Sequence, residues 1–453
     1  MKKLFGTDGM RGEAGKFPLD AATIQIVGSS LAARLREKLG RAPLIVVGRD
    51  TRESGEWLEQ ALLAGADSAG AESKSAGVIT TPGVAFLART LPADAGVVIS
   101  ASHNAFQDNG IKIFAPSGRK LDEETERLIE SDVFSQSPTK PGDHSFAPVA
   151  THAGEAADLK ARYLDFLAGE ISRDMSLRGI RLVLDCANGA ASDIGPELFR
   201  RLGAVVTVIN NTPDGRNINL GCGSLHTEAL QAVVTRNGAA LGVAFDGDAD
   251  RALFVDTRGR LVNGDGSLWV LARYLHARHE LNQDTVVATV MSNIGLELAF
   301  QSEGIRLIRT DVGDKYVLEE LLRLGASLGG EQSGHIIFPG LSLAGDGLIT
   351  TLCLLRAMTT AGKDLHELTA GFQTFPQILV NVQVKIKRPF AEIPAIQDSA
   401  REIETKLGSQ GRLLLRYSGT ESLARVMIEG KSQAEIEKHA NILASVIQQT
   451  LGA

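Results

Sequence analysis

Apolar and polar residues follow one order in three stretches of the chain: an apolar strand, a loop, a helix, a glycine and a second apolar strand. The first stretch has strands at residues 44–48 and 77–79 and a helix at residues 57–69. The same order returns over residues 181–209 and 285–310. Strands that alternate with helices of this length predict βαβ units in parallel or mixed sheets. The units lie further apart than any solenoid period, so we expect three similar α/β domains in series.

The C-terminal part of the chain has a different pattern. Residues 378–386 alternate apolar and polar positions, as a half-exposed strand does. Residues 413–415 and 424–428 look like two further strands, and residues 433–451 like an amphipathic helix. This part therefore predicts a separate small α+β domain. A segment rich in Pro, Ser, Thr and Gly at residues 135–151 predicts a linker or loop.

Together these patterns predict an α/β fold: three similar mixed α/β domains in series and a smaller C-terminal α+β domain. The length of 453 residues fits this division, since a domain takes about 150 residues. We expect boundaries near residues 150, 255 and 370, which gives domains at 1–150, 151–255, 256–370 and 371–453.

The composition limits which binding partners and which cellular compartment we expect. The net charge of −7 argues against nucleic acid or a membrane surface as the general partner, because both favour a basic face. A small anionic substrate still fits, since it needs only a local cluster of Arg and Lys. The three cysteines are widely spaced, which fits a reducing cytosol. We read no signal peptide and no membrane span, so we expect a cytoplasmic protein.

Three aspartates follow the apolar strand at residues 241–245 at every second position: Asp246, Asp248 and Asp250. They can converge on one hard cation if the backbone curls at Gly247, and oxygen ligands of this kind suit Mg²⁺ or Ca²⁺. An EF-hand is excluded, because Arg251 and Thr257 stand where that loop needs Gly and Glu. The alternative is a solvated acidic turn, which repulsion among three packed carboxylates disfavours.

A second polar loop follows the apolar strand at residues 96–100. It carries Ser102, His103 and Asn104, and the segment Asp-Asn-Gly-Ile-Lys at residues 108–112 comes soon after. A serine at the carboxyl end of a strand is well placed to be a nucleophile or a phosphate carrier. The GxSxG elbow of α/β-hydrolases is absent. Taken alone, such a stretch is more often a polar turn than an active site.

Three more polar loops stand out. Residues 329–335, Gly-Gly-Glu-Gln-Ser-Gly-His, offer hydrogen-bonding groups suited to sugar hydroxyls, although such a loop is often only a turn. Residues 416–421, Arg-Tyr-Ser-Gly-Thr-Glu, form a plausible anion-binding nest, which is compatible with a β-turn between two strands. Residues 5–12 hold one cation, Arg11, and their composition assigns nothing beyond a turn.

These five motifs, in this order and over the whole chain, resemble the α-D-phosphohexomutase superfamily, and in particular its members that act on glucosamine phosphate. The matching segments are FGTDGMRG, SASHN with DNGIK, DGDADR, GEQSGH and RYSGTE. The set is specific, although no single motif is. The resemblance implies four domains around a central cleft. Phosphomannomutase-like relatives typically have Met where Gln332 stands here.

The resemblance also implies residue roles. Ser102 would carry the phosphoryl group, and its phosphate would join the three aspartates on one Mg²⁺ per chain. The other catalytic candidates are Lys112, Arg251, His335 and Arg11. The sugar would contact Glu331 and Ser333, with Lys315 nearby in place of the more usual Arg. The non-reacting phosphate would contact a further set: Arg416, Ser418, Gly419, Thr420 and Arg425.

The implied reaction interconverts glucosamine 6-phosphate and glucosamine 1-phosphate through phospho-Ser102, with a hexose or hexosamine bisphosphate as intermediate and activator. The implied setting is bacterial synthesis of UDP-N-acetylglucosamine and cell-wall precursors. Phosphomannomutase or phosphoglucomutase activity, a phosphoserine-dependent sugar phosphatase and a non-catalytic sugar-phosphate-binding protein remain alternatives. The expected partner is a small sugar phosphate, with neither nucleic acid nor membrane, and the expected assembly is a homodimer.

Overall fold

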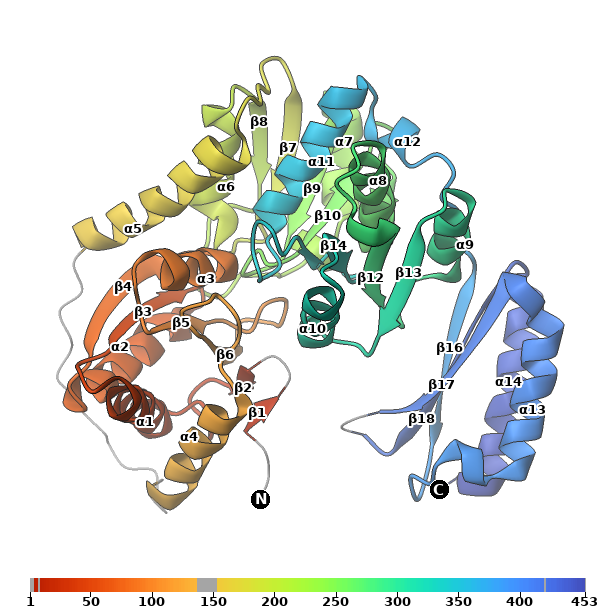
Figure 1. The fold of residues 1–453 in the computed structure, drawn as a ribbon, viewed down its shortest axis with the longest axis horizontal. Helices are drawn as coiled ribbons and strands as arrows, with labels where there is room; N and C mark the ends of the chain where they lie inside the picture. The colour runs from red at the N-terminus through yellow and green to blue at the C-terminus, as the bar shows by residue number, and fades with distance from the viewer. Residues whose placement is uncertain (1–3, 7–8, 137–152, 419–420, 453) are drawn as a thin grey trace. The chain divides into compact units, whose positions relative to one another are not determined.

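A computed structural model describes residues 4–6, 9–136, 153–418 and 421–452 (Figure 1). The chain forms two compact units. The first unit comprises Met1–Val290 and Ile308–Ala370, and the second comprises Met291–Leu307 and Gly371–Ala453. Within the described residues, no helix is both long and apolar enough to cross a membrane.

The first sheet has six strands in the order β1-β2-β6-β5-β3-β4. Its strands are β1 (Phe5–Gly6), β2 (Gly9–Glu13), β3 (Leu44–Arg49), β4 (Glu72–Val78), β5 (Ala95–Ile99) and β6 (Asp108–Phe114). The accompanying helices are α1 (Ala21–Leu39), α2 (Glu53–Ser68), α3 (Thr81–Thr90) and α4 (Glu123–Gln136). Strand β3 pairs in parallel with β4 and β5, so the segments after β3 and β5 leave the same edge of the sheet. Helices α1, α2 and α4 bury one apolar face against it.

Helices α1 and α2 approach each other closely because glycine faces backbone on both. A Cβ on Gly28 would lie 2.1 Å from the carbonyl oxygen of Leu62. A Cβ on Gly65 would lie 2.0 Å from the carbonyl oxygen of Gln25. Side chains cannot occupy that space, so these two glycines set the distance between the helices.

The second sheet has five strands in the order β11-β10-β9-β7-β8. Its strands are β7 (Arg181–Asp185), β8 (Val205–Ile209), β9 (Leu241–Phe245), β10 (Ala252–Val255) and β11 (Leu261–Val262). The helices of this region are α5 (Ala153–Phe166), α6 (Ala191–Arg201) and α7 (Glu228–Asn237). Every residue of β9 is buried, and the strand ends directly before the three aspartates.

The third sheet has the order β13-β12-β14-β15. Its strands are β12 (Thr285–Thr289), β13 (Arg306–Thr310), β14 (Leu328–Gly330) and β15 (Ile336–Ile337). The helices of this region are α8 (Gly264–Ala277), α10 (Asp314–Leu324), α11 (Gly347–Ala361) and α12 (Leu365–Leu368), of which α8 and α10 contact the sheet. Strands β14 and β15 form an antiparallel pair, and we call residues 331–335 between them the histidine turn.

The second unit is built on an antiparallel sheet in the order β16-β18-β17. Its strands are β16 (Gln377–Gln383), β17 (Gly411–Tyr417) and β18 (Leu423–Gly430). Helices α13 (Pro394–Leu407) and α14 (Gln433–Leu451) lie side by side and pack on the sheet (Figure 1). Helix α9 (Ile294–Ser302) belongs to this unit, and its first N–H donates to the buried carboxylate of Glu429.

The predicted fold class is confirmed, with three α/β regions followed by a smaller α+β region. Individual bounds differ: the helix predicted at residues 57–69 begins at Glu53, and the strand predicted at residues 378–386 ends at Gln383. Most of the predicted linker at residues 135–151 lies outside the described residues. The central cleft and the domain boundaries stay predictions.

Candidate active site

Ser102 lies just beyond β5, in what we call the serine loop, residues 100–106. The strand is buried along its whole length, so the loop starts from a fixed point. Ser102 is itself fully buried and has a positive φ of 53°, in the left-handed region that a non-glycine residue rarely adopts. Its Oγ donates a hydrogen bond of 2.6 Å to Asp246 Oδ2, and His103 Nδ1 lies 3.3 Å away.

The three aspartates form a buried group that we call the aspartate cluster: Asp246, Asp248 and Asp250. Each can offer one oxygen such that all three oxygens lie within 4.8 Å of one another. Among the described residues, no donor lies within hydrogen-bonding distance of the buried Asp248 Oδ1 or Asp250 Oδ1, although two cationic groups lie 3.7 Å from the latter. Buried carboxylate oxygens that lack a donor are costly unless a cation compensates them. The donor set is all oxygen, which fits Mg²⁺.

Two side chains, one on the first sheet and one on a helix beside it, reach the aspartate cluster. Lys112 on β6 is 2% exposed, and its Nζ lies 2.8 Å from Asp248 Oδ2 and 3.3 Å from Asp250 Oδ2. Thr81 begins α3, and its Oγ1 donates to Asp248 Oδ2 at 2.6 Å. Both contacts use the same oxygen of Asp248 and leave its Oδ1 for another partner.

The electrostatic environment shifts the pKa values of Asp246 and Asp250 in opposite directions. Burial, together with repulsion from Asp250 and Asp248, raises the pKa of Asp246 well above its usual range. Burial also acts to raise the pKa of Asp250, but the charges of Lys112 and His335 outweigh it and hold that pKa well below normal. A cation at the cluster would act in the same direction as Lys112 by favouring ionised carboxylates.

The histidine turn brings His335 to the cluster. Its Nδ1 lies 3.7 Å from Asp250 Oδ1, and its Nε2 lies 3.9 Å from Asp314 Oδ2. Burial would lower the pKa of His335, but these two carboxylates raise it to about 9. Gly345 lies against the imidazole, since a Cβ there would be 2.3 Å from Nε2. The ring is therefore held between carboxylates with no room to withdraw.

The other residues of the histidine turn have distinct surroundings. Glu331 accepts a hydrogen bond from the N–H of Gly313, and Ser333 is exposed. Gln332 Nε2 donates to Asp265 Oδ2 at 3.3 Å, and its carbonyl accepts from Gly264 N at the start of α8. A Cβ on Gly264 would lie 1.9 Å from the carbonyl oxygen of Glu331. Helix α8 therefore fixes the backbone of this turn.

Two arginines surround the serine loop and the aspartate cluster. The N–H of Arg251 donates to Asp246 Oδ1 at 3.2 Å, and its Nε lies 3.7 Å from Asp250 Oδ1. Arg11 on β2 lies opposite Gly110 on β6. Burial lowers the pKa of His103, and the charges of Arg251 and Arg11 lower it further. Both guanidinium groups thus act on the environment of the serine loop.

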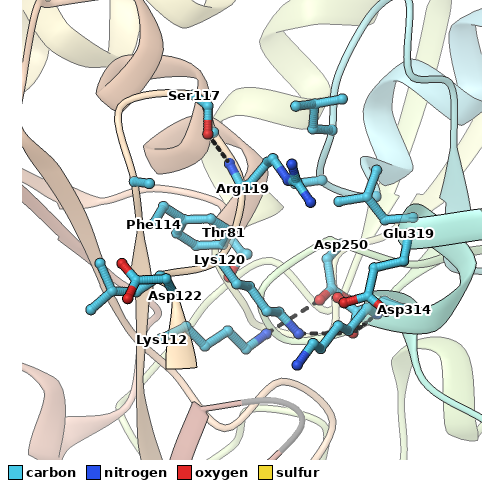
Figure 2. A pocket seen from close by; sticks show the side chains of 18 of the residues that line it. Thr81, Lys112, Phe114, Ser117, Arg119, Lys120, Asp122, Asp250, Asp314 and Glu319 are labelled. Carbon is cyan, nitrogen blue, oxygen red and sulfur yellow. Dashed lines mark hydrogen bonds and ion pairs between the residues drawn. The ribbon is translucent and has the colours of Figure 1, made fainter. Parts of the chain in front are cut away.

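A cavity of about 690 Å³ adjoins this cluster (Figure 2). Its lining includes four of the predicted site residues: Lys112, Asp250, Lys315 and His335. Lys120 Nζ pairs with Asp314 at 2.8 Å, and Lys315 pairs with Glu123. Figure 2 shows Arg119 on one side of the cavity and Glu319 on the other. The volume suits a small ligand, and the polar lining favours a charged or hydroxylated one.

The predicted phosphate loop lies in the second unit. Arg416 on β17 stands directly opposite Arg425 on β18, and we call these two residues the arginine pair. Burial, and then the charge of Arg425, lowers the pKa of Arg416. Arg425 Nη2 also lies 3.0 Å from Glu421 and 3.5 Å from Ser418 Oγ. Gly419 and Thr420 lie outside the described residues.

Sequence reasoning missed three residues at the site. Thr81 orients Asp248, and Arg52 and Asn219 both donate to the carbonyl oxygen of Ser102. Arg52 could have been found, because it follows β3, a strand parallel to β5 whose end lies at the same sheet edge. Asn219 lies in a loop of the second domain, and nothing in its local sequence indicates the contact.

Comparison with known families gives one consistent result. Four phosphoglucomutase/phosphomannomutase domain descriptions match the chain: α/β/α domain I at residues 2–140, α/β/α domain II at 161–259, α/β/α domain III at 263–375 and the C-terminal domain at 379–446. A phosphoglucosamine mutase of Solibacter usitatus is 49% identical over 453 residues, which cover 100% of this chain and 99% of that protein.

Two solved structures share the fold. A phosphoglucomutase/phosphomannomutase family protein from Burkholderia thailandensis aligns with a TM-score of 0.79 at 24% identity, covering 98% of this chain and 97% of that one. The N-acetylphosphoglucosamine mutase of Aspergillus fumigatus, solved with GlcNAc-6P and magnesium, aligns with a TM-score of 0.66 at 18% identity. That alignment covers 99% of this chain and 96% of that one.

Proposed function

The chain belongs to the phosphoglucomutase/phosphomannomutase family, and on that premise we propose that it interconverts glucosamine 6-phosphate and glucosamine 1-phosphate. The observation that carries the proposal is the hydrogen bond between Ser102 Oγ and Asp246, inside a buried carboxylate cluster beside Lys112 and His335. The amino-sugar substrate follows from the full-length relatives called phosphoglucosamine mutase.

The reaction consists of two phosphoryl transfers. In the first, the C1 hydroxyl oxygen of glucosamine 6-phosphate attacks the phosphorus on Ser102. The bond from phosphorus to Oγ breaks, the C1 hydroxyl loses its proton, and Oγ gains one. After the resulting bisphosphate turns end for end, Oγ attacks the phosphate at C6 and gives up its proton. The C6 oxygen takes up a proton, and glucosamine 1-phosphate leaves.

Residues of the cluster would lower the barrier by positioning groups and neutralising charge, which phosphoryl transfer chiefly requires. Asp246, Asp248 and Asp250 would hold one Mg²⁺, which supplies positive charge to the transferring group when bound. Lys112, which contacts Asp248, and Arg251, which lies near Asp250, bring the other positive charges to the cluster. Lys112 and His335 are the candidates for moving the proton of the sugar hydroxyl.

Binding of the substrate would be divided between two regions. Glu331 and Ser333 would bind ring hydroxyls, with Lys315 beside them. The arginine pair, with Ser418, Gly419 and Thr420, would hold the phosphate that does not react. Because either end of the bisphosphate must fit there, those contacts are made to phosphate and not to the ring. Cytoplasmic location and a homodimer stay predictions.

Assays of glucosamine, glucose and mannose 6-phosphates side by side, with product analysis, test the proposal. We expect glucosamine phosphate to have the highest kcat/KM, with measurable turnover of glucose phosphate. An equal or higher kcat/KM for glucose or mannose phosphate would move the assignment to phosphoglucomutase or phosphomannomutase. Release of inorganic phosphate without isomerised sugar would instead indicate a phosphatase.

A further inference from the structure

The backbone of Ser102 is held in an unfavourable conformation by a specific set of contacts. Its φ of 53° is rare for a residue with a side chain, so the surrounding groups must impose it. The donors involved come from outside the serine loop. Arg52 precedes α2, and Asn219 belongs to the loop between β8 and α7.

Arg52 donates hydrogen bonds to three carbonyl groups of the serine loop. Its side chain is fully buried. Its Nη2 donates to the carbonyl oxygens of Ser102 at 3.0 Å and Asn104 at 2.9 Å, while Nη1 donates to that of Ala105. One guanidinium therefore binds three carbonyls within four residues, which a lysine ammonium cannot match in a fixed plane.

The same side chain also controls the N–H of Ser102 through a relay. Arg52 Nε donates to Asp50 Oδ2 at 2.9 Å, and Ser100 Oγ donates to that same oxygen at 2.6 Å. Ser100 Oγ in turn accepts from the N–H of Ser102 at 2.9 Å. Both the N–H and the C=O of Ser102 are thus fixed by one closed ring of hydrogen bonds.

The direction of the carbonyls decides where the loop's donors point. In a trans peptide the C=O and the following N–H point in opposite directions. Because the carbonyls of Ser102 and Asn104 face Arg52, the N–H groups of His103 and Ala105 are turned away from it. Backbone N–H groups presented together in this way form an anion-binding surface.

We propose that Arg52 is a positioning residue for phosphoryl transfer: it holds Ser102 so that Oγ faces the aspartate cluster and the loop's N–H groups face the phosphate on Oγ. The inference rests on the proposed function, because it requires Ser102 to carry phosphate. Arg52 makes this contribution through the loop backbone and does not touch the sugar.

The test compares Arg52→Lys with Arg49→Lys. Arg49 also pairs with a buried carboxylate, Glu59, at 3.0 Å on the neighbouring helix, so its loss disturbs the same domain. Each variant is incubated with glucose 1,6-bisphosphate at a temperature at which circular dichroism shows it folded. The rate of phosphate gain on Ser102 is followed by intact mass, and kcat and KM are measured for the sugar phosphates.

We expect Arg52→Lys to lower the phosphorylation rate and kcat by about a hundredfold while KM stays within threefold, as for a misplaced reacting group. Arg49→Lys should match the wild type in both rates. Equal losses in the two variants would overturn the inference, because the effect would then be general destabilisation. So would a loss in Arg52→Lys confined to KM.

A second variant covers the case in which Arg52→Lys does not fold. Ser100→Ala removes the relay to the N–H of Ser102 but leaves the guanidinium in place. We expect the same kcat-only loss at a smaller size, about tenfold, and an unchanged kcat would overturn the inference. If the wild type gains no phosphate on Ser102 from glucose 1,6-bisphosphate, the proposed function itself fails and takes the inference with it.

Discussion

The aspartate cluster and the arginine pair differ in how their charges are compensated. In the first, three buried carboxylates are already contacted by Lys112, Thr81 and the hydroxyl of Ser102. In the second, Arg416 and Arg425 stand opposite each other on adjacent strands, and the charge of one lowers the pKa of the other. Like charges directly opposite in a sheet are unfavourable, and Arg425 already has one counter-ion, Glu421, at 3.0 Å.

This difference assigns different tasks to the two regions. Groups fixed before substrate arrives can favour the transition state, which raises kcat. Cations that repel each other gain from any anion, so they bind the ground state and the bisphosphate alike and mainly lower KM. Substitutions in the aspartate cluster and serine loop should therefore change kcat, and substitutions in the arginine pair should change KM.

The largest effect is expected for Ser102→Ala. Loss of the hydroxyl removes the atom that accepts and returns phosphate, so turnover should fall by roughly 10³-fold or more. The melting temperature should stay unchanged. Steady-state kinetics and thermal melts check this. Ser117→Ala, which removes an exposed hydroxyl from the cavity beside the cluster, is the matched control and should retain full activity. A Ser102→Ala enzyme with more than a few per cent of activity would falsify the covalent role.

Metal removal should have the next largest effect. Because the cluster offers only oxygen ligands, we expect EDTA to abolish activity reversibly and Mg²⁺ to restore it. Calorimetric titration of Mg²⁺ should show one site per chain in the wild type and weakened binding in Asp248→Asn. Unchanged Mg²⁺ affinity in that variant would remove Asp248 from the ligand set, whatever its activity.

The Arg416→Ala substitution tests the other half of the comparison. A charge-assisted hydrogen bond to phosphate contributes about 1.5–3 kcal/mol, so KM should rise by about tenfold to a hundredfold with little change in kcat. Arg401→Ala removes an exposed arginine from α13 and should leave KM unchanged. A fall in kcat with constant KM would assign the arginine pair to the chemical step instead.

The smallest effect is expected for Gln332→Met. Its amide donates to Asp265, so we expect the residue to affect the sugar indirectly, by fixing the conformation of the histidine turn. We expect the ratio of kcat/KM for glucosamine phosphate over glucose phosphate to change by a few-fold at most, as when one weak contact is lost. Asp265→Asn should shift the ratio in the same direction. A constant ratio in both variants would exclude this contact from specificity.

Local pattern predicted most of the fold, because the α/β units show strands and helices directly in their apolar spacing. It also predicted that the three aspartates converge, since all three lie within five residues and follow one strand. The pairing of Lys120 with Asp314 could not be predicted, because the partners are 194 residues apart. Nor could the role of Gln332, whose partner Asp265 lies on a helix that packs against the turn only in the folded chain.

The histidine turn, whose backbone is fixed by Gly264, is also joined directly to the chain that follows the aspartate cluster. The N–H of Ala252, two residues beyond the aspartate cluster, donates to the carbonyl of Gly334, and a Cβ on Gly334 would lie 2.5 Å from the carbonyl oxygen of Ala252. The turn and the cluster are thus joined without adjustable side chains between them. The distance between the turn and the cluster is therefore constant. In the proposed reaction the sugar is held at this distance in both orientations, so only ligands whose C1 and C6 oxygens both fit it can complete the cycle.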